Sequence, residues 1–506
     1  MLQTSILSVT ASALILCLYP IVKWTYNAFF HPLAKVPGPR SWAASRIPFL
    51  VSMLRGNMIH DTEKLHRQYG PILRIGPDEV TFAHTDAWID ILQPRSGQPQ
   101  PIKDLLWWEN PGGTSLLSAV DSPSHSRMRK TLAPGFTESA LRAQEPIILR
   151  YVSLLIQRLG EIVDSNKQFS DRGATIDIFP WLNFTTFDIF GDLGFAESFN
   201  CLQNSEYHPW IARAFDSVKG AAFLAAVKHY PLFDWLLWRC IPPSLLKMRD
   251  DHFQFIADKL ERRKNWEVER PDIIAHALKE TKQGKGMSRP EVDTTFAILT
   301  IAGSETTATA LGGIVNYLAT NPHKRDILVE EIRTEFDSES DISVARATRL
   351  SYLRAVINEG LRLSPPIPWV LPRVVPAGGT RICGIWLPAG TKLSIGAYSL
   401  HRDPECFHLP TSFIPERWVS TEFERPGSPF CNDRRDAVQA FTIGPRSCLG
   451  KGLAWAEMQL VLAKLLWNFD ISVADGEPLR WEDLRTFLLV EKKPIRILFK
   501  KKEYSD

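Results

Sequence analysis

Cysteine is scarce in this chain, and charge of either sign is nearly balanced. The 506 residues include seven cysteines and no Cys-x-x-Cys pair, which leaves a zinc ribbon or a disulfide framework without support and indicates a reducing environment. The net charge is only +3, from 59 basic and 56 acidic residues, so a nucleic-acid partner is not expected. An apolar content of 44% and 16 tryptophans instead predict a packed globular protein.

Charged side chains are also absent from the first 22 residues. An apolar run of about this length can cross a bilayer, and the lack of a basic start argues against a cleaved signal peptide. Lys23 and Arg40 follow the run, so the positive-inside rule leaves the rest of the chain in the cytosol. We expect a transmembrane signal anchor at 1–22, a Pro-rich hinge at 23–40 and a single folded domain at 41–506. A buried helix at 1–22 is the alternative.

One cysteine lies in a glycine-flanked loop directly before a predicted helix. Residues 449–467 place apolar side chains three and four apart, which is typical of a helix with one buried face. Cys448 therefore lies at a helix N-terminus, where the dipole favours a thiolate by about 0.3–1 kcal/mol. Because one pKa unit requires about 1.4 kcal/mol and a free thiol titrates near ~8.5, the dipole alone leaves the thiol partly protonated. Full ionisation suggests a bound metal, and a buried cysteine in a Gly-Pro turn is the alternative.

The residues around this cysteine suit a flat, charged ligand. Gly444 and Gly450 allow close approach of the backbone, Arg446 offers a bidentate fork for a carboxylate, and Phe441 offers an apolar shield. The stretch resembles the haem-binding loop of the cytochrome P-450 family, Phe-x-x-Gly-x-Arg-x-Cys-x-Gly, at every fixed position. The resemblance implies haem b (iron protoporphyrin IX) with Cys448 as the axial ligand of the iron, whose thiolate favours O–O cleavage.

A second pattern predicts a long helix from Ser288 to about Thr320. Ser288 and Glu291 form a capping box at its start, and Asn321-Pro322 ends it. Its middle, residues 302–307, reads Ala-Gly-Ser-Glu-Thr-Thr. A glycine within a helix costs about 1 kcal/mol relative to alanine, which predicts a packing or functional reason for it.

The 302–307 segment is similar to the oxygen-activation motif of the same family. Gly303 would let a flat ligand or dioxygen lie close, and Ala302 lies one turn before Thr306 on the same face. Thr306 offers a hydroxyl that can bend the helix and hand on protons, and Glu305 is an adjacent acid. The resemblance implies that Thr306 and Glu305 are catalytic and that Ala302 and Gly303 bind the cofactor. A Gly-containing packed helix is the alternative.

Other basic residues match the positions at which the family binds the haem propionates. His125 and Arg129 lie four apart and share one helix face, although the family usually has tryptophan where this chain has His125. Arg373 follows an apolar stretch that passes the haem edge in the family. A solvated basic turn is the alternative for residues 125–130.

Glu359 and Arg362 lie three apart, which on a helix surface is a common pair that contributes little. The family couples such a pair with a later arginine, here Arg417, in a buried network that supports the haem-binding loop. The resemblance implies a structural rather than a catalytic role. Loss of one partner of a buried network would cost about 3–5 kcal/mol.

Two apolar segments have more than one interpretation. Trp107 and Trp108 lie in the Pro- and Gly-rich segment 93–118, which caps the substrate pocket in the family, and packing on the core is the alternative. Residues 229–243 correspond to a loop that often enters the membrane, and a buried helix pair is the alternative. Further patterns predict regular elements, as helices at 141–163, 176–193 and 248–266 and as strand pairs at 72–83, 381–395 and 486–499.

The resemblance implies a mainly α fold with small β-sheets (α+β), in which haem lies between a long central helix and the cysteine loop. The implied reaction inserts one oxygen atom from dioxygen into a small apolar substrate, and the His-Pro-Leu-Ala-Lys-Val-Pro-Gly-Pro stretch beginning at His31 resembles fungal secondary-metabolism members. A haem-thiolate enzyme that catalyses desaturation, ring closure, coupling or rearrangement is the alternative, and a non-catalytic haem-binding protein is a third. The acid–threonine pair favours oxygen activation.

The same resemblance implies partners and a location. Electrons would come from NADPH through a cytochrome reductase, with cytochrome b5 as a further partner. The basic residues Arg127, Lys130 and Lys451 would dock an acidic reductase. The protein is expected in the endoplasmic reticulum membrane as a single-pass protein, with its catalytic domain on the cytosolic side.

Overall fold

The computed structural model describes residues 18–108, 113–167, 173–208, 220, 222–266, 270–282, 286–474 and 476–502. Most of the expected anchor, residues 1–17, lies outside this range, and the anchor stays a prediction. Residues 18–29 are helical, and Tyr19, Val22 and Trp24 are exposed on them. Among the described residues, one helix, α15 (Arg289–Thr320), is long and apolar enough to cross a membrane. Because 67% of its most apolar part is buried inside the protein, α15 is a core helix.

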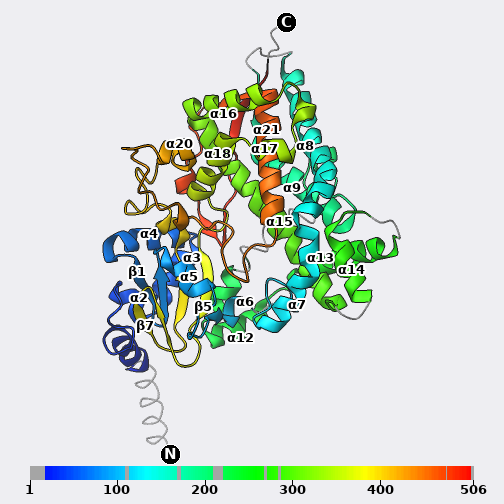
Figure 1. Cartoon of the computed structure of the whole chain (residues 1–506). Helices are drawn as coiled ribbons and strands as arrows, with labels where there is room; N and C mark the ends of the chain where they lie inside the picture. The colour runs from blue at the N-terminus through cyan, green and yellow to red at the C-terminus, as the bar shows by residue number, and fades with distance from the viewer. Residues whose placement is uncertain are drawn as a thin grey trace, which may run out of the picture.

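Helices make up most of the protein, and β1, β5 and β7 lie at its lower left in Figure 1. Besides the helical residues 18–29, the described helices of at least seven residues are α3 (Ile47–Leu54), α4 (Met58–Tyr69), α5 (Asp86–Leu92), α7 (Ser122–Leu132), α8 (Glu138–Lys167), α9 (Ile178–Phe195), α12 (Pro231–Cys240), α13 (Pro243–Asn265), α14 (Ile273–Lys282), α15, α16 (Pro322–Glu335), α18 (Ser351–Leu363) and α21 (Lys451–Asn468). The shorter ones are α2 (Arg40–Ala44), α6 (Leu105–Trp108), α10 (Cys201–Asn204), α17 (Val344–Ala347), α19 (Ala397–Leu400) and α20 (Ser420–Phe423).

The strands form four small sheets. The largest has the order β1-β2-β8-β5-β3, and the others are β4-β12-β9, β6-β7 and β10-β11. Their bounds are β1 (Ile72–Gly76), β2 (Glu79–Phe82), β3 (Ile102–Lys103), β4 (Ala174–Asp177), β5 (Val370–Val374), β6 (Thr380–Ile382), β7 (Ile385–Leu387), β8 (Lys392–Ile395), β9 (Phe469–Val473), β10 (Thr486–Phe487), β11 (Leu489–Val490) and β12 (Arg496–Lys501).

The predicted strand pairs are confirmed in part. Residues 72–83 form the hairpin β1–β2, with Ile72 opposite Phe82. The 381–395 region divides between the hairpin β6–β7 and the strand β8, which pairs with β2 and β5 instead. In the 486–499 region β10 pairs with β11, whereas β12 pairs with β4 and β9. Local alternation therefore predicted strands here, and the long-range partners were decided by tertiary packing.

One helix boundary was predicted wrongly. Residues 174–177 form the strand β4, and helix α9 begins only at Ile178. Ile176 pairs with Ile497 of β12, so its backbone groups bond across a sheet. The carboxylate of Asp177 accepts a hydrogen bond from the backbone N–H of Phe179 at 3.2 Å, which caps the helix at this point.

The capping box predicted for the long helix is confirmed. The side chain of Ser288 and that of Glu291 each bond the other residue's backbone, with Pro290 in the first turn, and α15 runs from there to Thr320. The helix contacts α9, α13, α18 and α21, so helices surround much of it. This explains why its apolar residues are not confined to one face.

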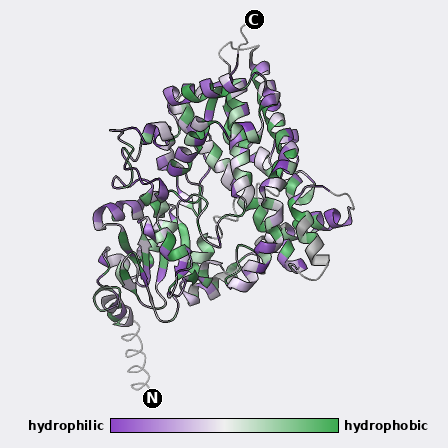
Figure 2. Cartoon of the chain, viewed as in Figure 1, coloured by the Kyte–Doolittle hydropathy of each residue, from purple (hydrophilic) through white to green (hydrophobic). Residues whose placement is uncertain are grey.

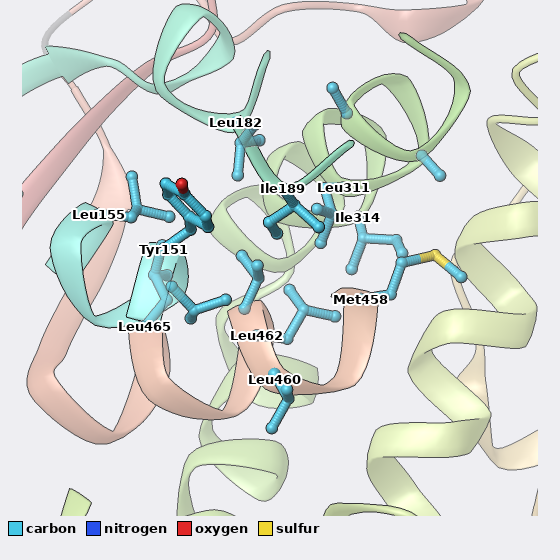
Figure 3. Close-up of a cluster of buried hydrophobic side chains, with 14 of the residues drawn as sticks. Tyr151, Leu155, Leu182, Ile189, Leu311, Ile314, Met458, Leu460, Leu462 and Leu465 are labelled. Atoms are coloured by element: carbon cyan, nitrogen blue, oxygen red, sulfur yellow. The ribbon is translucent and has the colours of Figure 1, made fainter. Parts of the chain in front are cut away.

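A core of apolar side chains joins four helices. Figure 3 shows Tyr151 and Leu155 of α8 near Leu182 and Ile189 of α9, Leu311 and Ile314 of α15, and Met458, Leu460, Leu462 and Leu465 of α21. In Figure 2 hydrophobic residues gather on the helix sides that face the interior. The helix predicted at 449–467 is thus confirmed as α21, and its apolar face fixes the end of the cysteine loop to the core.

Candidate active site

The cysteine loop is closed by its own backbone. The N–H of Cys448 donates to the carbonyl of Phe441 at 2.9 Å, and that of Ser447 donates to Gly444 at 3.0 Å. Helix α21 starts at Lys451 with Gly450 as its N-cap, so Cys448 lies two residues before the cap. The loop therefore presents the sulfur beside the free N–H groups of a helix start.

Two arginines fasten this loop to the chain around α7. Arg129 of α7 donates to the carbonyl of Ser447 at 2.7 Å. Arg446 uses its fork on backbone carbonyls, with Nη1 2.5 Å from Ala119 O and Nη2 2.7 Å from Val120 O. The fork expected to face a ligand carboxylate is thus occupied by the backbone, although the guanidinium charge remains at the site.

The two glycines of the loop have different surroundings. Gly444 has φ +81°, and a Cβ there would lie 2.4 Å from the carbonyl oxygen of Leu92. Glycine is required at this point by the turn and by the approach of Leu92, and the predicted approach of a flat ligand stays a prediction. A Cβ on Gly450 would meet only Phe136, at 3.9 Å, so close approach to a ligand stays possible there.

The thiol of Cys448 is not ionised by the protein alone. Burial raises its pKa, and the N–H of Gly450 with the charges of Arg129 and Lys451 lowers it by less. The side chain nevertheless has accessible surface, so the sulfur is open to a ligand. Among the described residues no three His, Cys, Asp or Glu side chains lie together as a metal site. A metal at Cys448 would therefore have to bring its other ligands with it, as the iron of a porphyrin does.

Five basic side chains gather beside the loop. They are Lys103 of β3, His125 and Arg129 of α7, Arg373 of β5, and Arg446. Lys103 and Arg373 are direct partners across the β3–β5 pair, an arrangement that is unfavourable for like charges. Within the described part of the chain, no salt bridge joins any of the five to a carboxylate.

Burial and the neighbouring positive charges lower the pKa values of three groups in the cluster. Burial, with the charges of Arg446 and Arg373, lowers the pKa of Lys103 to about 6. Burial and the four other cations lower the pKa of His125 to about 4, so His125 is a neutral donor. Burial and Arg446 lower the pKa of Arg373 to about 10. The cluster lacks negative charge, and the two carboxylates of iron protoporphyrin IX would supply it, so the residues present fit this group.

The long helix has one accessible stretch in its buried middle. Ala302 is exposed and Thr306, one turn later, is half-buried, while Ser304, Glu305 and Thr307 are buried. The hydroxyl of Thr306 donates to the carbonyl of Ala302 at 2.7 Å. The face shared by these two residues is therefore open to a ligand.

Two residues of the motif point elsewhere. A Cβ on Gly303 would lie 3.1 Å from the ring of Phe190, so packing against α9 favours glycine here, and the predicted contact with a ligand stays a prediction. Glu305 is 1% exposed and contacts Lys492, which follows β11. The acid of the motif is thus paired within the protein.

The structure joins the three residues of the expected structural network. Arg362 donates to Glu359 at 2.7 and 2.8 Å, and Arg417 donates to the same carboxylate at 3.1 Å. All three side chains are fully buried. Trp418 also donates to Glu359, at 2.9 Å. Arg417 continues to Asp433, so the network connects α18 with the segment that precedes the cysteine loop.

The structure describes parts of the two apolar segments, 93–118 and 229–243, that had more than one interpretation. Trp107 packs edge-on against Trp369 with ring centres 5.3 Å apart, and Lys103 lies 4.0 Å from the ring centre of Trp108. The tryptophans thus pack on the protein next to the basic cluster. Residues 231–240 form helix α12, and Leu232 and Trp235 are exposed on it. The alternative interpretation of this segment as a buried helix pair is therefore wrong.

Sequence reasoning missed Lys103 and Lys492. Both lie far along the chain from the motifs that they join, and no local pattern surrounds them. For Lys103, its position between Ile102 and Asp104 gave no sign of burial. Only the pairing of β3 with β5 and the return of the C-terminal segment to α15 bring these lysines to the site.

The site combines a single cysteine in a helix-anchored loop, a basic cluster and an accessible threonine on a central helix. This combination is typical of haem-thiolate proteins with a helical fold. The family model of cytochrome P-450 matches residues 37–499, and the chain belongs to this family. It is 38% identical to the trichothecene C-15 hydroxylase of Fusarium sporotrichioides over 95% of each chain. It is 40% identical to cytochrome P-450 monooxygenase astJ of Aspergillus oryzae over 94% of each. It is 37% identical to the averantin hydroxylase of Dothistroma septosporum, over 95% of this chain and 89% of that one.

The mainly helical fold with small sheets is therefore confirmed as the fold of this family. The chain is a haem-thiolate monooxygenase that acts on a small organic substrate and receives electrons from a redox partner. Fungal microsomal members of the family are typically membrane-associated.

Proposed function

We propose that Cys448 is the axial ligand of haem b and that the protein inserts one oxygen atom into a small apolar metabolite. The observation that carries this proposal is the cluster of five basic groups beside the cysteine loop, of which Lys103, His125 and Arg373 are buried and none forms a salt bridge with a carboxylate among the described residues. Two propionates would neutralise that cluster. When bound, the haem supplies the activation of dioxygen.

Each remaining residue has a role that its surroundings support. His125, Arg129, Arg373 and Lys103 would donate to the propionates, and Arg446 would contribute charge from the carbonyls that hold it. Phe441 would shield the sulfur, and Gly450 and Ala302 would leave room for the ring. Gly303 and Gly444 would also let the backbone lie close to the ring, while their Cβ positions face Phe190 and Leu92.

Protons would reach the reacting centre through α15. Thr306 presents its hydroxyl at the accessible stretch, and Glu305 is the adjacent acid. A general acid held at such a position typically contributes about 10²–10⁴-fold to a rate. The apolar face around Ala302 would hold the substrate, whose oxidised position depends on the loops above it.

The proposal extends to the location of the protein and to its electron donors. Residues 1–22 would anchor the protein in the endoplasmic reticulum, 23–40 would act as the hinge, and 41–506 would form one cytosolic catalytic domain. NADPH would supply electrons through a cytochrome reductase, with cytochrome b5 as a second donor. Arg127 is engaged by Glu291 at 2.6 Å, so Lys130 and Lys451 remain as exposed charges for docking.

The direct test uses the full-length protein, its reductase, NADPH and isotopically labelled dioxygen with candidate apolar metabolites. We expect one labelled oxygen atom in the product. A product that is desaturated or ring-closed and carries no label would assign the alternative reaction. Haem binding without NADPH-dependent conversion of any tested metabolite would count against the proposal.

Replacing Thr306 by alanine should uncouple electron use from product formation. Because the accessible hydroxyl is lost while the helix remains, we expect product per NADPH to fall by about 10-fold and peroxide release to rise. Thr307→Ala is the matched control, since Thr307 is buried and its hydroxyl donates to Gly303 O at 3.1 Å. Unchanged coupling in Thr306→Ala would remove Thr306 from proton delivery.

Replacing Lys103 by methionine should weaken haem retention. A charge-assisted hydrogen bond contributes about 1.5–3 kcal/mol, so we expect haem to dissociate at least about 10-fold faster. Transfer of haem to an excess of an apoprotein acceptor measures this rate. Lys130→Met, at an exposed position of α7, should leave it unchanged. Equal rates for the two variants would exclude Lys103 from the haem site.

A further inference from the structure

A lysine from the C-terminal segment contacts the acid of the long helix. Lys492 lies between β11 and β12, and its ammonium group forms an ion pair with Glu305 of α15. The same ammonium group donates to the hydroxyl of Thr309, one turn further along α15. It also lies 4.8 Å from the ring centre of Phe179 at the start of α9. These contacts place one cation between two helices at the motif.

Glu305 has few other groups to stabilise its charge. Its side chain is 1% exposed, and Oε2 has no hydrogen-bond partner among the described residues. Burial raises its pKa, and Lys492 and the hydroxyl of Thr309 oppose that effect. Among the described residues, Tyr207 is a second titratable group that the charge of Glu305 affects, because its pKa is raised by burial and by that charge, and its oxygen accepts from Asn183 at 3.2 Å. Lys492 is therefore the cation on which the carboxylate depends.

The backbone on both sides of Lys492 is held in place. Glu491 accepts from the backbone N–H of Arg485 at 2.7 Å and from its Nε at 2.9 Å. Ile495 donates its N–H to Asp177 at 2.9 Å. A lysine between two such anchors has a defined position relative to α15, as a positioning residue requires.

We infer that Lys492 is a positioning residue for oxygen insertion, which keeps Glu305 ionised between proton transfers and fixes its orientation on α15. The inference rests on the proposed role of Glu305 in proton delivery. In each transfer the Glu305 carboxylate takes up one proton from the bulk solvent and passes one toward the Thr306 hydroxyl, so it returns to the carboxylate and its charge is unchanged over a turnover. Lys492 is 24% exposed and lies where it can stabilise the carboxylate and still contact solvent.

The test is the pH dependence of coupling, measured as product per NADPH, in Lys492→Met. Removing a cation next to a carboxylate makes ionisation harder, so the limb of the profile that reports on Glu305 should move to higher pH by about one unit or more. Lys492→Arg should restore the original profile. Lys493→Met is the matched control, because Lys493 is 49% exposed and pairs only loosely with Glu491, at 3.7 Å.

A double variant separates this inference from the proposed function. If Lys492 acts through Glu305, then Lys492→Met in a Glu305→Gln background should change nothing further. An unshifted profile in Lys492→Met, or no rescue by Lys492→Arg, would overturn the inference while Glu305→Gln still lowers coupling. If Glu305→Gln itself leaves coupling unchanged, the proposed role of Glu305 fails instead. Each variant is compared only where its reduced carbon-monoxide spectrum matches that of the parent protein.

Discussion

Alanine in place of Cys448 is expected to abolish both the haem-thiolate spectrum and the monooxygenase activity. The sulfur is the only protein atom of the loop suited to bind iron, and among the described residues no His, Cys, Asp and Glu cluster could replace it. The reduced parent protein with carbon monoxide should show the strongly red-shifted Soret band of a thiolate ligand. In Cys448→Ala that band should be absent, and NADPH-dependent product should fall to background.

Two further variants make this result specific. Cys431 is an exposed free cysteine outside the loop, so Cys431→Ala should keep the band and the activity. Cys448→His retains a ligand of another chemistry, and it should bind haem without the red shift. A red-shifted band that persists in folded Cys448→Ala would show that another group binds the iron. Loss of helicity in both Cys448 variants would trace the result to folding, and Cys431→Ala guards against a general effect of losing a thiol.

The raised pKa of the Cys448 thiol means that its reactivity as a thiolate is a poor test of its role as a ligand, so the test is spectroscopic. Burial raises its pKa beyond what the Gly450 N–H and the charges of Arg129 and Lys451 recover. Without iron, Cys448 is thus a thiol at neutral pH. The dipole argument from the sequence reached the same conclusion from the magnitude of about 0.3–1 kcal/mol, before any neighbour was known.

The parts of the site that could be predicted from the sequence are those encoded locally. The loop from Phe441 to Gly450 and the capping box at Ser288 are each determined by residues a few positions apart, and the structure forms both elements. The neighbours that a residue faces could not be predicted from the sequence. Gly303 faces Phe190, and Gly444 faces Leu92, because neighbouring elements approach from directions that helix periodicity alone does not encode.

Contacts between distant segments account for the rest. Lys103 reaches the basic cluster only because β3 pairs with β5, and Lys492 reaches Glu305 only because the C-terminal segment returns to α15. The strand β4 was missed because its partner, β12, lies at the other end of the chain. A pattern in one segment cannot specify such partners, since strand pairing depends on both members.

Replacing Glu359 by glutamine should lower the free energy of unfolding by about 3–5 kcal/mol. The carboxylate accepts from Arg362, Arg417, Trp418 and the backbone of Ile414, all within 3.1 Å. Glutamine keeps the shape but leaves two fully buried guanidinium groups without their shared counter-charge. Denaturant unfolding of the holoprotein, followed by helicity, measures the difference.

A surface pair provides the matched control for this variant. Glu335 pairs with Arg346 at 3.3 Å with both side chains well exposed, so Glu335→Gln should change the unfolding free energy by less than about 1 kcal/mol. Equal effects of the two variants would mean that burial of the Glu359 network contributes nothing to stability. Activity per bound haem should remain in Glu359→Gln, because none of its partners lies in the basic cluster or on the open face of α15.

The pH dependence of this difference gives an independent check of the charge on Glu359. Burial would raise its pKa, but the charges and hydrogen bonds of Arg362, Arg417 and Trp418 lower it below the ordinary value. A pKa depressed in the folded state adds stability above the unfolded pKa, near ~4.3, and this stability is lost as the pH falls through the folded value. The gap between the parent protein and Glu359→Gln should therefore be full at neutral pH and shrink below about pH 4. A gap that instead widened toward acid would mean that Glu359 is protonated in the folded protein and that the two arginines are neutralised by other groups.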